Sequence, residues 1–187
     1  AGRARSLEAL DRRDEALAAY KTACLLSAED LSLHKGRARA LEALGENAEA
    51  LEAYEVVCAK DGQDAVAQFR RGVLLEALGR DEDALVAYEA SCRIADRFVD
   101  AAQHRAAILD RLGRRKEALA AYGRWIELDP TNAGALERSG QLLAELGRYE
   151  QALVAFDKAF KLSAAETPEA RARRSRTLES LGAALLE

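Results

Sequence analysis

The stretch that decides the fold is Leu78–Cys92, which reads LGRDEDALVAYEASC. Close copies begin at Leu44, Leu112 and Leu146, so the same pattern returns every 34 residues. Each copy opens on a Leu-Gly pair and then places alanines and an aromatic residue at fixed distances from it. Self-similarity at such a period is the sequence signature of a repeat protein, in which each unit contacts mainly its neighbours.

Further columns keep this register along the whole chain. One step before Leu44 the pair becomes Leu10-Asp11, and Leu181-Gly182 lies 35 residues after Leu146, which places a one-residue insertion after the fifth copy. The leucine column is Leu7, Leu41, Leu75, Leu109 and Leu143. The alanine columns are Ala16, Ala50, Ala84, Ala118 and Ala152, then Ala19, Ala53, Ala87, Ala121 and Ala155. The aromatic column is Tyr20, Tyr54, Tyr88, Tyr122 and Phe156.

Within each copy the apolar residues recur at the three-to-four spacing of an amphipathic helix. Gly79 separates two such runs, at the position where a left-handed cap would end the first helix. Asp61-Gly62, the turn at 129–132 and Thr167-Pro168 mark the other breaks. Each copy is therefore predicted to be a helix-turn-helix hairpin. Small alanines let the two helices pack closely, and the aromatic residue wedges against the next hairpin.

The pattern resembles the tetratricopeptide repeat family, and the resemblance covers essentially all 187 residues as about five and a half repeats. It implies an all-α, right-handed superhelical solenoid of antiparallel helix-turn-helix hairpins, with first helices lining a concave face. We expect a single solenoid domain over 1–187, with repeats at about 1–30 (partial), 31–64, 65–98, 99–132, 133–166 and 167–187 (partial, or a capping helix).

Some family positions are altered. Small residues at the tight helix crossing are kept as Ala38, Gly72, Ala106 and Gly140. The usual Trp of the first helix is replaced by His34, Gln68, Ala102 and Leu136, and the closing Pro survives only as Pro130. These departures leave the predicted fold intact but do not define a subfamily.

Composition narrows the classes of function. Hydrophobic residues make up 49% and charged residues 32% of the chain, which is typical of a globular protein. The net charge of -4 argues against a duplex nucleic-acid binder. No apolar run approaches the roughly 18 residues that span a bilayer, and the first ten residues lack the apolar segment of a signal peptide. Cytoplasm is the default expectation for the compartment.

Neither the cysteines nor the histidines form a catalytic or metal-binding pattern. Cys24, Cys58 and Cys92 are 34 residues apart, so stacked hairpins would hold them about 10 Å apart, too far for a disulfide or zinc site. We interpret them as buried small hydrophobes, with a reactive thiol as the alternative. His34 is expected to be packed, and no Ser-His-Asp set or phosphate-binding loop is present. We therefore predict no enzyme activity, no cofactor and no metal.

Arginine forms a periodic row of its own. The row comprises Arg3, Arg37, Arg71 and Arg105 and is broken by Ser139. Strict periodicity favours a structural role, in which the stems cross the hairpin interface and the heads meet carboxylates of the neighbouring repeat. Ligand binding by this row is the alternative.

Residues that vary between copies are better candidates for contact with a partner, because a partner is rarely periodic. On the first helices, an acidic row of Glu8, Glu42, Glu76 and Asp110 lies beside such varied columns. The predicted groove residues are Lys35, Arg39, Glu42, Phe69, Arg70, Val73, Glu76, Gln103, His104, Asp110 and Arg138. With an exposed Phe69, this face suits a peptide or helix of mixed charge. The alternative is a solvated face with pairs such as Arg39 with Glu42 along one helix.

The sequence thus predicts a protein-interaction scaffold that holds a peptide or helix of a partner protein, with no nucleic acid and no membrane involved. The alternative is a structural spacer, or a homo-oligomer joined through incomplete end repeats. The family's carboxylate clamp for chaperone tails is judged absent, because asparagine occurs only at Asn47 and Asn132. The arginines of 167–187 are interpreted as part of a capping helix or further repeat rather than a basic patch.

Overall fold

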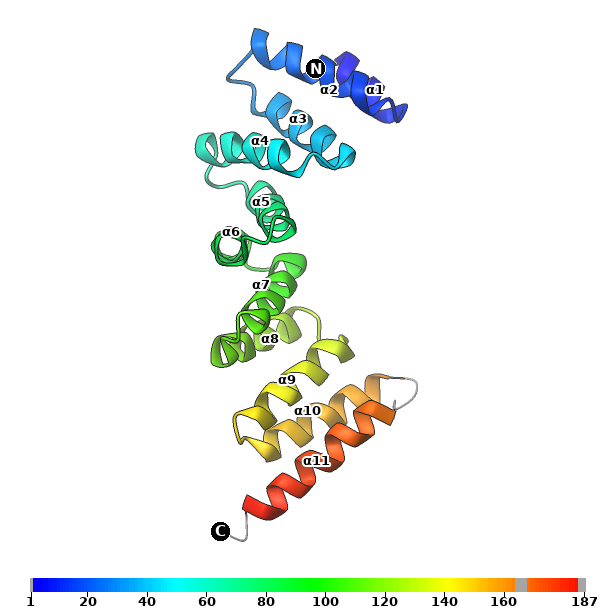
Figure 1. Cartoon of the computed structure of the whole chain (residues 1–187), viewed down its shortest axis with the longest axis vertical. Coiled ribbons are helices and arrows are strands. Elements are labelled where there is room, and N and C mark those ends of the chain that lie inside the picture. Colours follow the sequence, from blue (N-terminus) through cyan, green and yellow to red (C-terminus); the bar gives the residue numbers. More distant parts are fainter. Residues whose placement is uncertain (1, 164–167, 185–187) are drawn as a thin grey trace. The chain divides into compact units, whose positions relative to one another are not determined.

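The computed structural model describes residues 2–163 and 168–184, and every element in this part of the chain is an α-helix (Figure 1). The helices are α1 (Gly2–Ala9), α2 (Arg13–Leu26), α3 (Leu31–Leu44), α4 (Asn47–Lys60), α5 (Ala65–Ala77), α6 (Asp81–Ile94), α7 (Val99–Arg111), α8 (Arg115–Leu128), α9 (Ala133–Glu145), α10 (Tyr149–Leu162) and α11 (Pro168–Ala184). They fall into two compact units, Ala1–Asp96 and Arg97–Glu187, which are described separately below. The predicted all-α architecture is confirmed.

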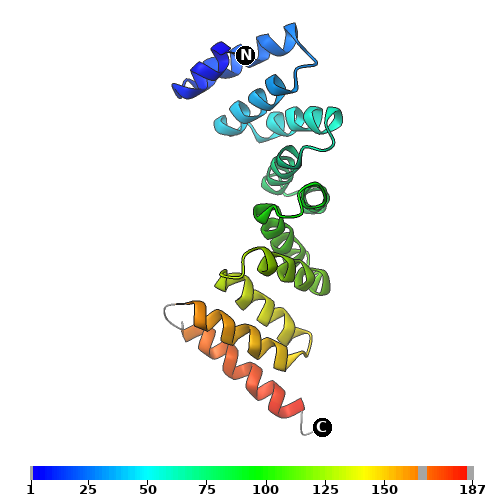
Figure 2. The same cartoon turned by 180° about the vertical axis from the view of Figure 1, so that it is seen from behind.

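Consecutive helices pair as antiparallel hairpins, visible from both sides in Figures 1 and 2. In the first unit α1 packs on α2, α3 on α4 and α5 on α6, and in the second unit α7 packs on α8 and α9 on α10. Each hairpin also packs on the next one within its unit, through α2 with α3, α4 with α5 and α8 with α9. These are the contacts that the repeat period predicts.

The predicted left-handed cap is confirmed at the turn inside the hairpins. Gly79 has a φ of +73°, and the amide of Arg80 donates to the carbonyl of Leu75 across the turn (2.8 Å). Asp11 occupies the same position in the first hairpin with a φ of 55°. A residue with a Cβ is strained in this conformation, so the first turn is less favourable than the others.

The hairpin interior is built from a buried ring against a small residue, as the alanine and glycine columns predict. Tyr88 is fully buried, and a Cβ placed on Gly72 would lie 2.6 Å from its ring. In the second unit Gly140 stands in the same relation to Phe156, at 2.7 Å. A further close approach was not predicted: a Cβ on Gly36 would lie 2.2 Å from the ring of Tyr20 in the preceding hairpin.

The last helix, α11, packs along α10 and touches α9. Allowing for the one-residue insertion, Leu178 falls in the column of Leu41 and Leu75, so α11 has the register of a first helix. Leu41 and Leu75 are fully buried, whereas Leu178 is 50% exposed and, among the residues described, the adjacent Thr177 is the buried residue of α11. Thr167 of the predicted break and the side chains of Leu181 and Gly182 lie outside the described residues.

We expect Gly72→Ala to lower the free energy of unfolding by about 1–3 kcal/mol, because the added methyl group would collide with a buried ring that has no free space to enter. Gly123→Ala is the matched control. Gly123 is also helical but has nothing within 4 Å of an added Cβ, so the better helix propensity of alanine should raise stability by about 0.5–1 kcal/mol. Urea unfolding followed by circular dichroism measures both, and a stabilising Gly72→Ala would contradict the packing argument.

Candidate functional site

A tyrosine of the second helix donates a hydrogen bond to a carboxylate of the first helix in each of the first four hairpins. The pairs are Tyr20 Oη to Glu8 Oε2 (2.8 Å), Tyr54 Oη to Glu42 Oε2 (3.2 Å), Tyr88 Oη to Glu76 Oε2 (2.6 Å) and Tyr122 Oη to Asp110 Oδ2 (3.5 Å). In the fifth copy Phe156 and Ala144 stand at these two positions, so hydroxyl and carboxylate are lost together. Each acid of this row therefore provides the hydrogen-bond acceptor that the hydroxyl of a buried tyrosine needs.

An arginine from the next first helix joins the pair. In the first unit Arg70 donates from Nη1 to Glu42 Oε1 (3.2 Å). In the second unit Arg138 contacts Asp110 with two nitrogens, Nε to Oδ2 and Nη2 to Oδ1 (2.6 Å for the latter). We call such a set a tyrosine–carboxylate–arginine trio. Each trio ties one hairpin to the next by charge-assisted hydrogen bonds.

The trio of Glu8 uses a different arginine. Gly36 occupies the position that Arg70 and Arg138 hold in later copies, and it has no side chain to reach Glu8. Arg39, one turn further along α3, donates to Glu8 instead (3.2 Å). The alternative of an Arg39–Glu42 pair along one helix is not what the structure shows, because Arg39 pairs with Glu8 and Glu42 pairs with Arg70 of the next hairpin.

The electrostatics of the trios keep every tyrosine as a donor. Burial and the neighbouring carboxylate raise the pKa of Tyr54 and Tyr122 above the ordinary range, although the adjacent arginines oppose the rise. The hydrogen bond to Asp110 raises the pKa of Arg138. The hydroxyls of Tyr54 and Tyr122 therefore remain protonated donors at neutral pH.

Phe69 belongs to the core and not to an exposed surface, so the expectation of an exposed Phe69 is wrong. Only 9% of the residue is accessible, and its ring lies 5.9 Å from that of Tyr88. The guanidinium carbon of Arg70 lies 6.0 Å from the Phe69 centroid on the outer side, and this contact shields the ring from solvent.

The other predicted groove residues differ in how much they offer a partner. Gln103 is exposed, whereas Val73 and His104 are half-buried. Lys35 forms an ion pair with Asp64, whose carboxylate also caps α5 by accepting from the amide of Ala67 (2.9 Å). Arg39 and Arg70 keep 57% and 46% of their side chains accessible. Cationic heads are thus the most accessible charged groups among the predicted groove residues of the first unit.

The cysteines are free and half-buried instead of fully buried. Burial raises the pKa of the Cys24 and Cys58 thiols, and the nearby charges of Arg37 and Arg71 only partly oppose this. Both thiols are therefore protonated at neutral pH and weak as nucleophiles.

Of the periodic arginines, Arg37, Arg71 and Arg105 are half-buried, whereas Arg3 is exposed. These arginines were predicted to contact a carboxylate of the neighbouring repeat. Arg71 instead donates from Nη1 to the side-chain oxygen of Gln68 in its own helix (3.4 Å). Nε of both Arg37 and Arg71 is buried without a hydrogen-bond partner in the described part of the chain. His34 is half-buried, with Nε2 2.8 Å from the carbonyl oxygen of Ala28.

Two further features bear on function. Across residues 2–163 and 168–184, no three side chains of His, Cys, Asp or Glu gather in a way that could hold a metal ion. None of the helices described is both long and apolar enough to cross a membrane.

Models of the tetratricopeptide repeat match the chain over residues 2–65, 99–132 and 121–154. The chain belongs to the tetratricopeptide repeat family. Proteins of this family are in general scaffolds for protein interaction, and that general role is the one the chain's fold supports. No protein of curated function matches the chain in sequence.

Solved structures of tetratricopeptide repeat proteins share this fold at low sequence identity. MamA is 19% identical with a TM-score of 0.77, covering 85% of this chain and 93% of its own. YrrB, described as having an unusual peptide-binding site, is 22% identical with a TM-score of 0.74, covering 86% and 82%. A thermophilic protein of Thermus thermophilus is 23% identical with a TM-score of 0.54, covering 94% and 95%. Identities this low establish the fold alone.

A double-mutant cycle on Tyr54→Phe and Glu42→Ala should give a coupling energy of about 1 kcal/mol, because each change removes one side of a mostly buried hydrogen bond. Urea unfolding supplies the four free energies. The control cycle is Arg80→Gln with Asp83→Asn, an exposed pair that should couple by less than about 0.5 kcal/mol. Equal coupling in the two cycles would contradict a structural role for the trio.

The pair of Lys35 with Asp64 predicts a pH dependence of stability. Burial raises the pKa of Asp64, but the hydrogen bonds from Lys35 and the α5 amides outweigh it and lower the pKa below its usual value of about 3.9. A carboxylate with a depressed folded pKa stabilises the native state above its unfolded pKa, and this stabilisation is lost as the pH falls through the folded pKa. Asp64→Asn should therefore cost about 0.5–1 kcal/mol at pH 7 and progressively less below pH about 4. Thermal unfolding from pH 7 to 2 measures this, and a constant cost would contradict it.

Proposed function

We propose that the chain is a non-catalytic scaffold that binds a peptide or helix of a partner protein against its first helices. The observation that carries the proposal is the pair of accessible cations, Arg39 and Arg70, on the first helices of the first unit. Each makes a carboxylate contact of 3.2 Å within the described residues, and its exposed guanidinium offers further N–H donors to an incoming acid. Binding by such a pre-formed charged face needs little rearrangement.

Two comparisons support this choice. The family is in general one of interaction scaffolds, and YrrB is described as having a peptide-binding site. The protonated thiols of Cys24 and Cys58 and the engagement of the acidic row in trios speak for binding without chemistry. Acidic residues in the partner, flanked by apolar ones, would fit the cationic heads and the half-buried Val73.

The test is selection of peptides from a random displayed library, followed by fluorescence anisotropy of the best binder. Arg39→Gln/Arg70→Gln should weaken its binding by about tenfold or more, because both charges facing the peptide are removed. The matched control is Arg12→Gln/Arg80→Gln, which removes two exposed arginines that pair locally with Glu15 and Asp83. The control should stay within about twofold of wild type.

Equal loss in the two double variants would show nonspecific charge attraction, and no loss would move the site away from the first helices. Failure of the library to yield any peptide would favour the second candidate, a spacer or self-association module. Half-exposed Leu178 on α11 favours that candidate, because its equivalents are buried by a second helix. Sedimentation at several concentrations distinguishes self-association from a spacer.

A further inference from the structure

The fifth copy keeps the arginine of a trio but has lost its carboxylate and hydroxyl. Across the one-residue insertion, Arg173 of α11 stands 35 residues after Arg138, at the same position of its helix. The acid that this arginine would meet is replaced by Ala144, and the tyrosine by Phe156. The joint loss leaves space and a cation where the other copies hold an ion pair.

A pocket of about 290 Å³ lies at this place in the second unit. Its lining comprises Gln141, Ala144, Glu145, Phe156, Arg173, Arg176 and Thr177. Both residues that replace the missing pair are therefore in its wall. The pocket combines an apolar floor from Ala144 and Phe156 with two guanidinium groups at its edge.

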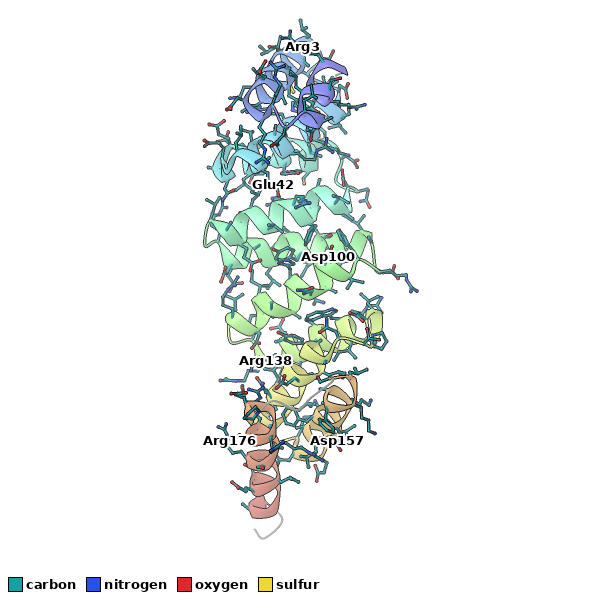
Figure 3. The ribbon with its side chains drawn as sticks, turned by 90° about the vertical axis from the view of Figure 1, so that its right-hand side faces the viewer. Arg3, Glu42, Asp100, Arg138, Asp157 and Arg176 are labelled. Carbon is teal, nitrogen blue, oxygen red and sulfur yellow. The ribbon has the colours of Figure 1, made fainter. Side chains whose placement is uncertain are left out.

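The donors of these arginines are only partly used. Nη2 of Arg173 contacts Glu137, but its Nε is buried and has no hydrogen-bond partner within the described residues. In the preceding copy the corresponding atom, Nε of Arg138, donates to Asp110. Nε of Arg176 donates only to the carbonyl of Ala172 in its own helix (3.3 Å), and the residue is exposed. Figure 3 shows Arg138 and Arg176 on one side of this unit, away from Asp157.

We propose that this pocket is a subsite for a single carboxylate, supplied by an aspartate or glutamate side chain of the partner. The incoming group would take the place of the missing acid, accepting from the guanidinium groups of Arg173 and Arg176 that line the pocket, as Asp110 accepts from Arg138. Glu145 also lines the pocket and pairs with Arg115 (2.7 Å), and Arg173 pairs with Glu137. These nearby carboxylates disfavour a doubly charged phosphate. That a partner protein supplies the carboxylate rests on the proposed function. That the pocket binds a carboxylate does not depend on it.

The test uses the whole chain and a small probe, N-acetylglutamate amide, titrated by NMR with observation of the arginine Nε–H signals. We expect saturable shifts at Arg173 Nε and at the amides of Ala144 and Thr177. The neutral analogue N-acetylglutamine amide should bind about tenfold more weakly or not measurably, since it lacks the charge-assisted bonds.

The decisive variant is Ala144→Glu/Phe156→Tyr, which supplies the missing carboxylate and hydroxyl from the chain itself. It should abolish probe binding and raise the melting temperature, because it rebuilds the trio of the earlier copies. Arg173→Gln, a matched second variant, should weaken the probe at least about tenfold with the fold retained. Circular dichroism verifies the fold of each variant.

Equal binding of the two probes, unchanged binding by the rebuilt trio, or tighter binding of inorganic phosphate would each overturn the proposal. These outcomes are independent of the peptide selection above, since the probe needs no partner protein. Loss of peptide binding with probe binding retained would reject the first-helix groove and leave the subsite standing.

Discussion

Each hairpin closes because an aromatic ring of its second helix lies against a residue of the first helix that has little or no side chain. The helices can approach only where that residue is alanine or glycine, and the ring then fills the remaining space. The ring also brings a consequence: a buried tyrosine hydroxyl needs an acceptor. The acidic row supplies it, the acid attracts an arginine from the next hairpin, and the packing of one hairpin thereby fixes its neighbour.

The repeat period made most of the fold predictable. A strictly periodic residue such as Gly79 reports a backbone or packing requirement that every copy shares, so its role could be read from one copy and transferred. That residues 1–187 form one domain stays a prediction, since the two compact units are described individually. Gly36 escaped notice because its column, which reads Gly2, Gly36, Arg70, His104 and Arg138, changes between copies and so gives no periodic signal.

The candidate site was harder to predict because its charges serve two purposes. The acids of the first helices were expected to face a ligand, yet Glu42 already accepts from both Tyr54 and Arg70. Sequence spacing allowed a pair within one helix as an alternative, whereas the structure joins residues 28 apart on adjacent hairpins. A signal was nevertheless available: where the tyrosine becomes Phe156, the acid becomes Ala144, and such a paired change marks two groups in contact.

The strained turn at Asp11 bears on which hairpin of the first unit unfolds locally most easily. A left-handed aspartate costs more than a glycine there, so the turn of the first hairpin is less favourable than the turns that carry Gly45 and Gly79. In an array whose stability is a sum over neighbours, the weakest end frays first while the interior stays closed. Within the first unit we therefore expect the α1–α2 hairpin to open more easily than the other two, and a partner that contacts only α3 and α5 would stay bound while it is open.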